Sequence, residues 1–176
     1  MSEGNWPAAL AAVLRHEGLW SDHPADPGGA TMKGITLVTF REARGADRTK
    51  EDLRAISDAD VSDIYRKRYW NAVRGDQLPA GVDLCVFDLA VNSGPGRAVR
   101  LLQQALGVNA DGSIGPKTLA AAHDADALTV IGEICDLRLA FLRSLPTWPT
   151  FGKGWWARVE SVRKEASSLA RHPSQE

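Results

Sequence analysis

Apolar residues recur at helical spacing along most of the chain, and no stretch alternates convincingly between apolar and polar over more than four residues. The first helical face is formed by Trp6, Leu10, Val13 and Leu14. Asn5 is placed to cap this helix, Pro7 suits its first turn, and we expect the helix to end at Glu17–Gly18.

Residues 82–93 are apolar almost all round, which is typical of a buried central helix. Asp88 and Asn92 interrupt it four residues apart and therefore share a face. Because a buried carboxylate needs partners, Asp88 either holds the loop of the first lobe in place by hydrogen bonds or lines a cleft. The sequence leaves both roles open and favours the structural one.

Capping residues predict further helices, and those placed to begin them are Thr36, Thr49, Ser57 and Pro116. Amphipathic helices are expected at about 127–143 and 154–171, and strands only within 22–36. The pattern therefore predicts a mainly α fold with a short β-hairpin or loop region after the first helix.

The break at Gly94–Pro95–Gly96 is the best candidate for a boundary between lobes. We expect a first lobe at 1–94, which contains the candidate catalytic residues described below, and a helical lobe at 95–176 packed on it. The helices of the second lobe are amphipathic and need the apolar central helix to cover them.

The stretch from residue 16 to residue 36 is composed unlike a core element or a plain surface loop. Asp22 and Asp26 follow Glu17, and glycines and prolines set turns between them. Glu17 continues the apolar face of the first helix, so we expect it to point toward the interior or a cleft. Partial burial and the negative end of the helix dipole favour a protonated carboxyl, as a general acid requires. An exposed glutamate at a frayed helix end fits the position equally well.

Several motifs in this stretch and beyond it resemble the signature of glycoside hydrolase family 108, the muramidase-type lysozymes of phage endolysins and related bacterial proteins. The matching motifs are HEG at 16–18, DHPADPGGATMKGIT at 22–36, FDLAVNSG at 87–94, DGSIGPKTL at 111–119 and FGKGWWARV at 151–159. Leu19 and Met32 depart from the family pattern, which usually has a glycine and an asparagine there.

The resemblance implies a lysozyme-like, two-lobed helical fold and hydrolysis of peptidoglycan glycan strands between N-acetylmuramic acid and N-acetylglucosamine. It implies that Glu17 is the catalytic acid. It also implies that the segment around 111–119 belongs to a peptidoglycan-binding repeat in the second lobe.

A glycosidase usually needs a second carboxylate. By resemblance to the Glu…Asp…Thr order of T-even phage lysozymes, Asp26 stabilises the developing charge and Thr31 positions a water. Asp22 competes for the role of Asp26 or holds the turn, and Thr36 is as suited to a helix cap as to a catalytic hydroxyl. Further candidates for substrate contact are Trp20, Asp22, Tyr69, Trp70 and Asn92. Aromatic rings at a helix end suit sugar stacking, although ordinary core closure explains them as well.

Two other functions stay open on the sequence alone. One is a non-catalytic wall-binding or scaffold protein that keeps a lysozyme-like fold. The other is a lytic transglycosylase, which uses a single acid and leaves an anhydro product.

Composition describes an ordinary globular chain of 176 residues, 44% of them hydrophobic, with a net charge of −1. Residues 1–94 carry 11 Lys and Arg against 14 Asp and Glu, and residues 95–176 carry 10 against 8. That asymmetry is too small to favour nucleic acid as a partner.

Cys85 and Cys135 lie in apolar stretches and are expected as buried free thiols, with a disulfide not excluded. The four histidines form no metal-ligand pattern, so we expect neither a metal nor a cofactor.

The N-terminus has no basic segment followed by a long apolar run, and no stretch reaches about 18 apolar residues. We therefore expect synthesis in the cytoplasm without a signal peptide, and no membrane insertion. Action on the wall in the periplasm would need a holin or another export route. We expect a monomer whose partner is the peptidoglycan glycan strand.

Overall fold

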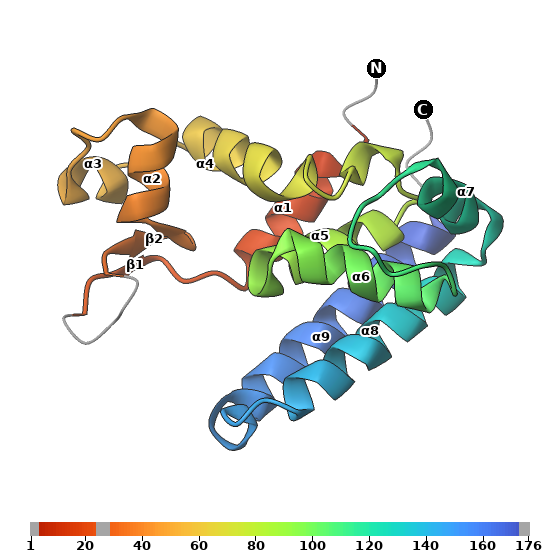
Figure 1. Cartoon of the computed structure of the whole chain (residues 1–176). Helices are drawn as coiled ribbons and strands as arrows, with labels where there is room; N and C mark the ends of the chain where they lie inside the picture. The colour runs from red at the N-terminus through yellow and green to blue at the C-terminus, as the bar shows by residue number, and fades with distance from the viewer. Residues whose placement is uncertain (1–3, 24–28, 173–176) are drawn as a thin grey trace. The chain divides into compact units, whose positions relative to one another are not determined.

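The computed structural model describes residues 4–23 and 29–172 and is mainly helical, with a small antiparallel sheet after the first helix (Figure 1). The helices are α1 (Trp6–Leu14), α2 (Leu37–Arg44), α3 (Lys50–Arg54), α4 (Asp58–Tyr65), the π-helical η1 (Arg66–Trp70), the 3-10 helix η2 (Gly75–Gln77), α5 (Val82–Ser93), α6 (Pro95–Ala105), α7 (Pro116–Asp124), α8 (Ala127–Arg143) and α9 (Trp148–Arg171). The strands are β1 (Trp20–Ser21), β2 (Thr31–Met32) and β3 (Ile35–Thr36). The expected fold class is confirmed. Among the described helices, none has the length and apolarity needed to cross a membrane.

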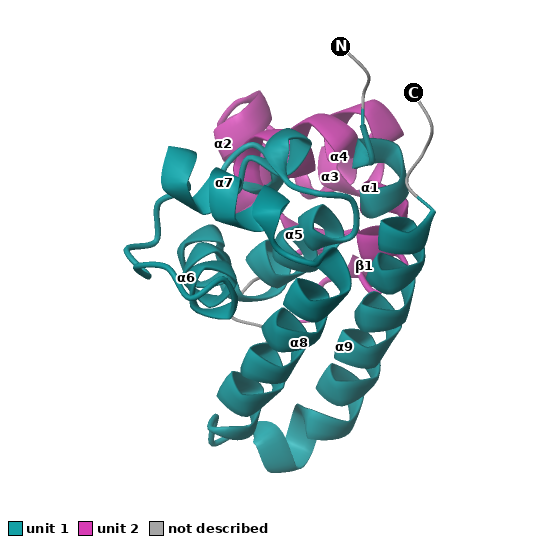
Figure 2. Ribbon diagram, turned by 90° about the vertical axis from the view of Figure 1, so that its right-hand side faces the viewer, with its two compact units in different colours: residues 1–9, 69–176 teal, residues 10–68 magenta. Residues whose placement is uncertain are grey.

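The chain divides into two compact units, coloured separately in Figure 2. The larger unit contains residues 1–9 and 69–176, and the smaller unit contains residues 10–68. The chain passes from one to the other within α1 and within η1. The lobe boundary at Gly94–Pro95–Gly96 stays a prediction: only Gly94, at a φ of 88°, separates α5 from α6 there.

The larger unit is built around α5, whose residues 82–90 are all buried. Helices α6, α8 and α9 pack on it, and α8 and α9 run side by side as an antiparallel hairpin (Figures 1 and 2). Gly81 precedes α5 at a point where a β-carbon would collide with the carbonyl oxygen of Ala166 in α9. A side chain at that position would therefore separate these two helices.

Asp88 is the charged centre of this helical packing and is fully buried. Its carboxylate accepts a hydrogen bond of 2.6 Å from Arg138 of α8 and bonds of 2.9 and 3.1 Å from Arg158 of α9. Burial alone would raise the pKa of Asp88, but the two guanidinium groups outweigh it and hold that pKa below its usual range. Asp88 therefore has a structural role, as the sequence favoured, but it holds α8 and α9 and not the loop of the first lobe.

An aromatic cluster packs around Phe87 of α5. The rings of Trp6, Trp70 and Phe87 meet with centroids 5.3 to 5.4 Å apart. The Trp70 indole donates a hydrogen bond of 2.9 Å to Asp76, so its polar group is satisfied inside the fold.

The loop between α6 and α7 is organised by a buried glutamine. Gln103 donates to Asp111 at 2.8 Å and to the carbonyl of Ser113 at 3.0 Å, and it accepts from the amide of Gly112 at 2.8 Å. The polar groups of this DGSIG segment are therefore used to shape the turn that leads into α7.

Local capping shapes the helices of the smaller unit. Thr49 and Asp52 form a reciprocal capping box at the start of α3, and Ser57 accepts from the amide of Asp60 at the start of α4. Thr36 accepts from the amide of Thr39 and caps α2. Of the two roles that the sequence left open for Thr36, helix cap and catalytic hydroxyl, the structure shows the cap. The order of the small sheet is β1-β2-β3, with antiparallel pairing throughout.

Several expected element ends need correction. Helix α1 ends at Leu14, three residues before Glu17, and α9 begins at Trp148, six residues before the expected start. Strand β1 precedes the 22–36 range. The expectation of free thiols is confirmed: Cys85 and Cys135 are buried with their sulfur atoms 3.9 Å apart.

Asp88→Asn should lower the free energy of unfolding by about 3–5 kcal/mol, because it leaves the buried Arg138 and the partly buried Arg158 without their counter-charge. The matched control is Asp136→Asn, which removes an exposed carboxylate that pairs with Arg163 across the same two helices. That change should cost less than about 1 kcal/mol. Urea unfolding followed by circular dichroism measures both, and equal losses in the two variants would contradict a special role for Asp88.

Candidate active site

Glu17 lies in a bend just past the end of α1. The amide of His16 donates to the carbonyl of Val13 at 2.9 Å, and that of Glu17 to Leu14 at 3.3 Å, so the chain tightens as it leaves the helix. Glu17 is half-buried. The sequence predicted that Glu17 continues the apolar face of the first helix, and this is wrong because the helix ends at Leu14. The position of Glu17 therefore depends on other elements.

The turn between β2 and β3 packs against the Glu17 carboxylate. Lys33 and Gly34 have φ values of 49° and 76°, so both occupy the left-handed region between the paired residues Met32 and Ile35. A β-carbon at Gly34 would lie 2.8 Å from Oε2 of Glu17 and would collide with the Tyr65 hydroxyl. The carboxylate and the phenol thus share the space that glycine leaves open.

Helix α4 fixes this turn at two points. The Tyr65 hydroxyl donates a 2.8 Å hydrogen bond to the backbone carbonyl of Lys33, and the Lys33 ammonium lies 2.6 Å from Asp58. The hydrogen bond from Lys33 lowers the pKa of the Asp58 carboxyl. The bond from Tyr65 to Lys33 joins residues 32 positions apart, and no local pattern in the sequence predicts it.

Strand pairing brings Trp20 opposite Met32 and Ser21 opposite Thr31. The Arg54 guanidinium lies 5.5 Å from the centre of the Trp20 ring, so one face of that half-buried ring is occupied. Thr31 is half-buried in the middle strand. Both candidates therefore lie in the small sheet whose β2–β3 turn contacts Glu17.

Asp22 follows β1, and both of its carboxylate oxygens contact the ammonium of Lys50, at 3.0 and 3.1 Å. This ion pair links the segment to α3. Asp26, the preferred second carboxylate, lies outside the described residues, as do Pro24, Pro27 and Gly28.

The remaining candidates belong to the larger unit. Asn92 is exposed near the end of α5, and Tyr69 is half-buried in η1. The prediction that Trp70 contacts the substrate is wrong. Its side chain is 0% exposed inside the aromatic cluster with Trp6 and Phe87, so it presents no face to a sugar.

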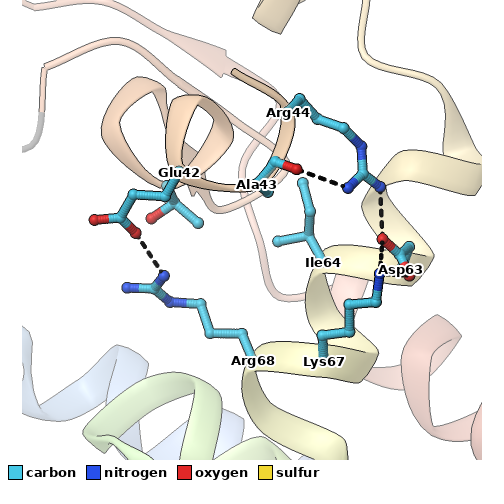
Figure 3. A pocket seen from close by; sticks show the side chains of 8 residues that line it. Glu42, Ala43, Arg44, Asp63, Ile64, Lys67 and Arg68 are labelled. Atoms are coloured by element: carbon cyan, nitrogen blue, oxygen red, sulfur yellow. Dashed lines mark hydrogen bonds and ion pairs between the residues drawn. The ribbon is translucent and has the colours of Figure 1, made fainter. Parts of the chain in front are cut away.

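A pocket of about 300 Å³ lies in the smaller unit between α2 and the α4–η1 helix (Figure 3). Its charged lining is paired internally: Arg44 and Lys67 bind Asp63, and Arg68 binds Glu42 at 2.9 Å. None of the candidate site residues lines it, so we do not assign the catalytic chemistry to this pocket.

Comparison with known proteins shows which families and structures this chain is similar to. Residues 10–94 match the family model described as glycosyl hydrolase 108, and residues 97–160 match one described as a predicted peptidoglycan domain. The solved structure of Brucella abortus SagA is similar over 97% of this chain and 98% of its own, with 47% identity and a TM-score of 0.86. Among curated proteins, none matches. The chain therefore belongs to the glycosyl hydrolase 108 family, and it is a glycoside hydrolase with a peptidoglycan domain in its C-terminal half.

Proposed function

We propose that this protein is an N-acetylmuramidase that cleaves the β-1,4 bond between N-acetylmuramic acid and N-acetylglucosamine in peptidoglycan, with Glu17 as the general acid. One observation carries the proposal: the Glu17 carboxylate is packed on the Lys33–Gly34 turn beside the Tyr65 hydroxyl. A proton donor must be held in place relative to the scissile oxygen, and this contact restricts where the carboxyl can lie. The match of residues 10–94 to a glycoside hydrolase family supports the reaction class.

In the proposed reaction, Glu17 gives its proton to the glycosidic oxygen as the bond to the anomeric carbon breaks. Asp26 is the proposed second carboxylate, which stabilises the positive charge that develops on the sugar ring. Thr31 is proposed to position the attacking water. Hydration of the ring carbon then yields a free reducing end and returns a proton to the site.

The glycan is proposed to contact Trp20, Asp22, Tyr69 and Asn92. The match of residues 97–160 to a peptidoglycan domain supports peptidoglycan as the polymer. We further propose that the enzyme works as a monomer on the wall in the periplasm, after passage by a holin or another export route.

The reaction is tested by mass spectrometry of the fragments released from purified peptidoglycan. Hydrated N-acetylmuramic acid at the reducing ends supports the muramidase. Anhydro ends would identify a lytic transglycosylase instead, and the absence of released fragments would leave a wall-binding protein. Free N-acetylglucosamine ends would show that the other β-1,4 bond is cleaved.

Glu17→Gln should reduce the rate of wall lysis by about 10²–10⁴-fold, because the amide cannot donate the proton. The melting temperature and binding to intact peptidoglycan should stay close to those of the parent. Clearing of permeabilised cells, measured by turbidity, gives the rate. A variant that clears cells as fast as the parent rules Glu17 out as the acid.

Asp26→Asn should lower turnover strongly, whereas Asp22→Asn should affect stability more than turnover. The second change removes the ion pair with Lys50, which is worth about 1 kcal/mol or less because both side chains are partly exposed. Lysis rate per folded molecule and melting temperature are measured for each variant. A stable but inactive Asp22→Asn protein would show that Asp22, and not Asp26, is the second carboxylate of the reaction.

Gly34→Ala should reduce both stability and lysis rate, because the methyl group needs the space now filled by the Glu17 carboxylate and the Tyr65 hydroxyl. Gly29→Ala is the matched control: its φ of 64° imposes similar strain, about 1 kcal/mol or more, but no atom lies within 4 Å of the added carbon. We expect the Gly34 variant to lose at least about tenfold more activity than the Gly29 variant, assayed per folded molecule. Equal activities would show that the turn does not position Glu17.

A further inference from the structure

We propose that the loop end of the α8–α9 hairpin, residues 143–156, is a surface that binds the glycan strands of peptidoglycan. We call this segment the hairpin tip. In Figures 1 and 2 the tip extends beyond α5 and α6 within the larger unit. The inference rests on the proposed function for the identity of the ligand, and on the tip itself for the place of binding.

The tip carries a continuous group of aromatic rings. Trp148, Phe151 and Trp155 are spaced by three and four residues and so share one face of α9. The Trp155 ring centre lies 6.3 Å from that of Trp148 and 5.7 Å from that of Phe151, and the planes of the latter pair differ by only 30°. Trp156 follows directly. Phe151 is 52% exposed and Trp156 is 49% exposed.

The two exposed rings lie five residues apart on α9. The other large exposed apolar side chains among the described residues are scattered: Leu19 lies between α1 and β1, Val38 in α2 and Leu128 in α8. Scattered apolar residues on a surface need no explanation, whereas a group of them indicates a binding surface. Planar aromatic rings also suit sugars, since a pyranose has an apolar face that stacks on them.

The rings are held in place before any ligand arrives. A β-carbon at Gly152 would lie 2.5 Å from atoms of the Trp148 indole, so this ring lies directly on the α9 backbone. The Arg143 guanidinium lies 5.8 Å from the centre of the same ring. A platform fixed on a helix loses little conformational entropy on binding.

The charge of the tip fits an anionic polymer. Residues 137–159 contain four Lys and Arg and no Asp or Glu. Two of these cations, Arg138 and Arg158, are held by Asp88, while Arg143 and Lys153 are exposed at the tip. Peptidoglycan offers both required chemistries, apolar sugar faces and the carboxylates of its peptide stems. An anionic lipid surface shares the charge, but the match of residues 97–160 to a peptidoglycan domain favours the glycan.

The test uses the full-length chain with Glu17→Gln, at 4 °C, to keep the sacculi intact. Phe151→Ala and Trp156→Ala are combined to remove the exposed rings, and Val38→Ala and Leu128→Ala are combined as the control, since these residues are also exposed but lie outside the tip. Cosedimentation with purified sacculi should show affinity about tenfold lower for the tip variant and unchanged for the control. Both should melt within a few degrees of the parent.

Full sacculus binding by the tip variant would overturn the inference. So would a loss seen only with vesicles of anionic phospholipid, which would make the tip a membrane surface, or a change only in self-association by analytical ultracentrifugation. Fragment release by the chain with native Glu17 is measured separately. Tip-dependent binding without release supports the inference and rejects the hydrolase proposal, whereas release with tip-independent binding does the reverse.

Discussion

The packing of α8 and α9 on α5 depends on a buried carboxylate. Asp88 lies in a mostly apolar helix, and its charge is balanced by arginines from two helices, 50 and 70 residues later in the chain. A buried ion pair adds little net stability compared with an apolar core, but breaking it leaves uncompensated charge. The arrangement therefore penalises any packing of α8 and α9 in which either arginine misses Asp88. It also places the hairpin tip, because Arg158 belongs to the same helix as the aromatic group.

The smaller unit uses charge in a different way. Its ion pairs, such as Arg44 with Asp60 and Asp63, are partly exposed and join short helices across their surfaces. Exposed pairs of this kind contribute little each. The Glu17 site adds to one such pair, Lys33 with Asp58, contacts that involve the backbone: the left-handed Lys33–Gly34 turn and the hydrogen bond from Tyr65 to a main-chain carbonyl. Such contacts have little freedom to vary, because the backbone cannot change rotamer as a long side chain does.

The sequence predicted well what is encoded locally. The bounds of α5 follow from an apolar run ended by glycine, and the caps at Thr36, Thr49 and Ser57 follow from side chains that bond amides three residues away. It failed where distant segments meet. Trp70 has the composition of a sugar platform, but its environment is set by Trp6 and Phe87, which no local pattern reveals.

Glu17 shows how a candidate residue can be reached by a geometric argument that the structure contradicts. The helical spacing that placed it on an apolar face stops at Leu14, since the chain tightens there into a turn. Its carboxylate lies instead against the Lys33–Gly34 turn, whose glycine comes 17 residues later in the chain. Lysine–glycine is only a weak hairpin signal compared with asparagine–glycine. The motif resemblance selects Glu17 without any such geometric argument, because a family signature reflects a whole folded site. Periodicity reports on one element at a time. It therefore cannot predict a site that is assembled from a bend, a hairpin turn and the end of α4.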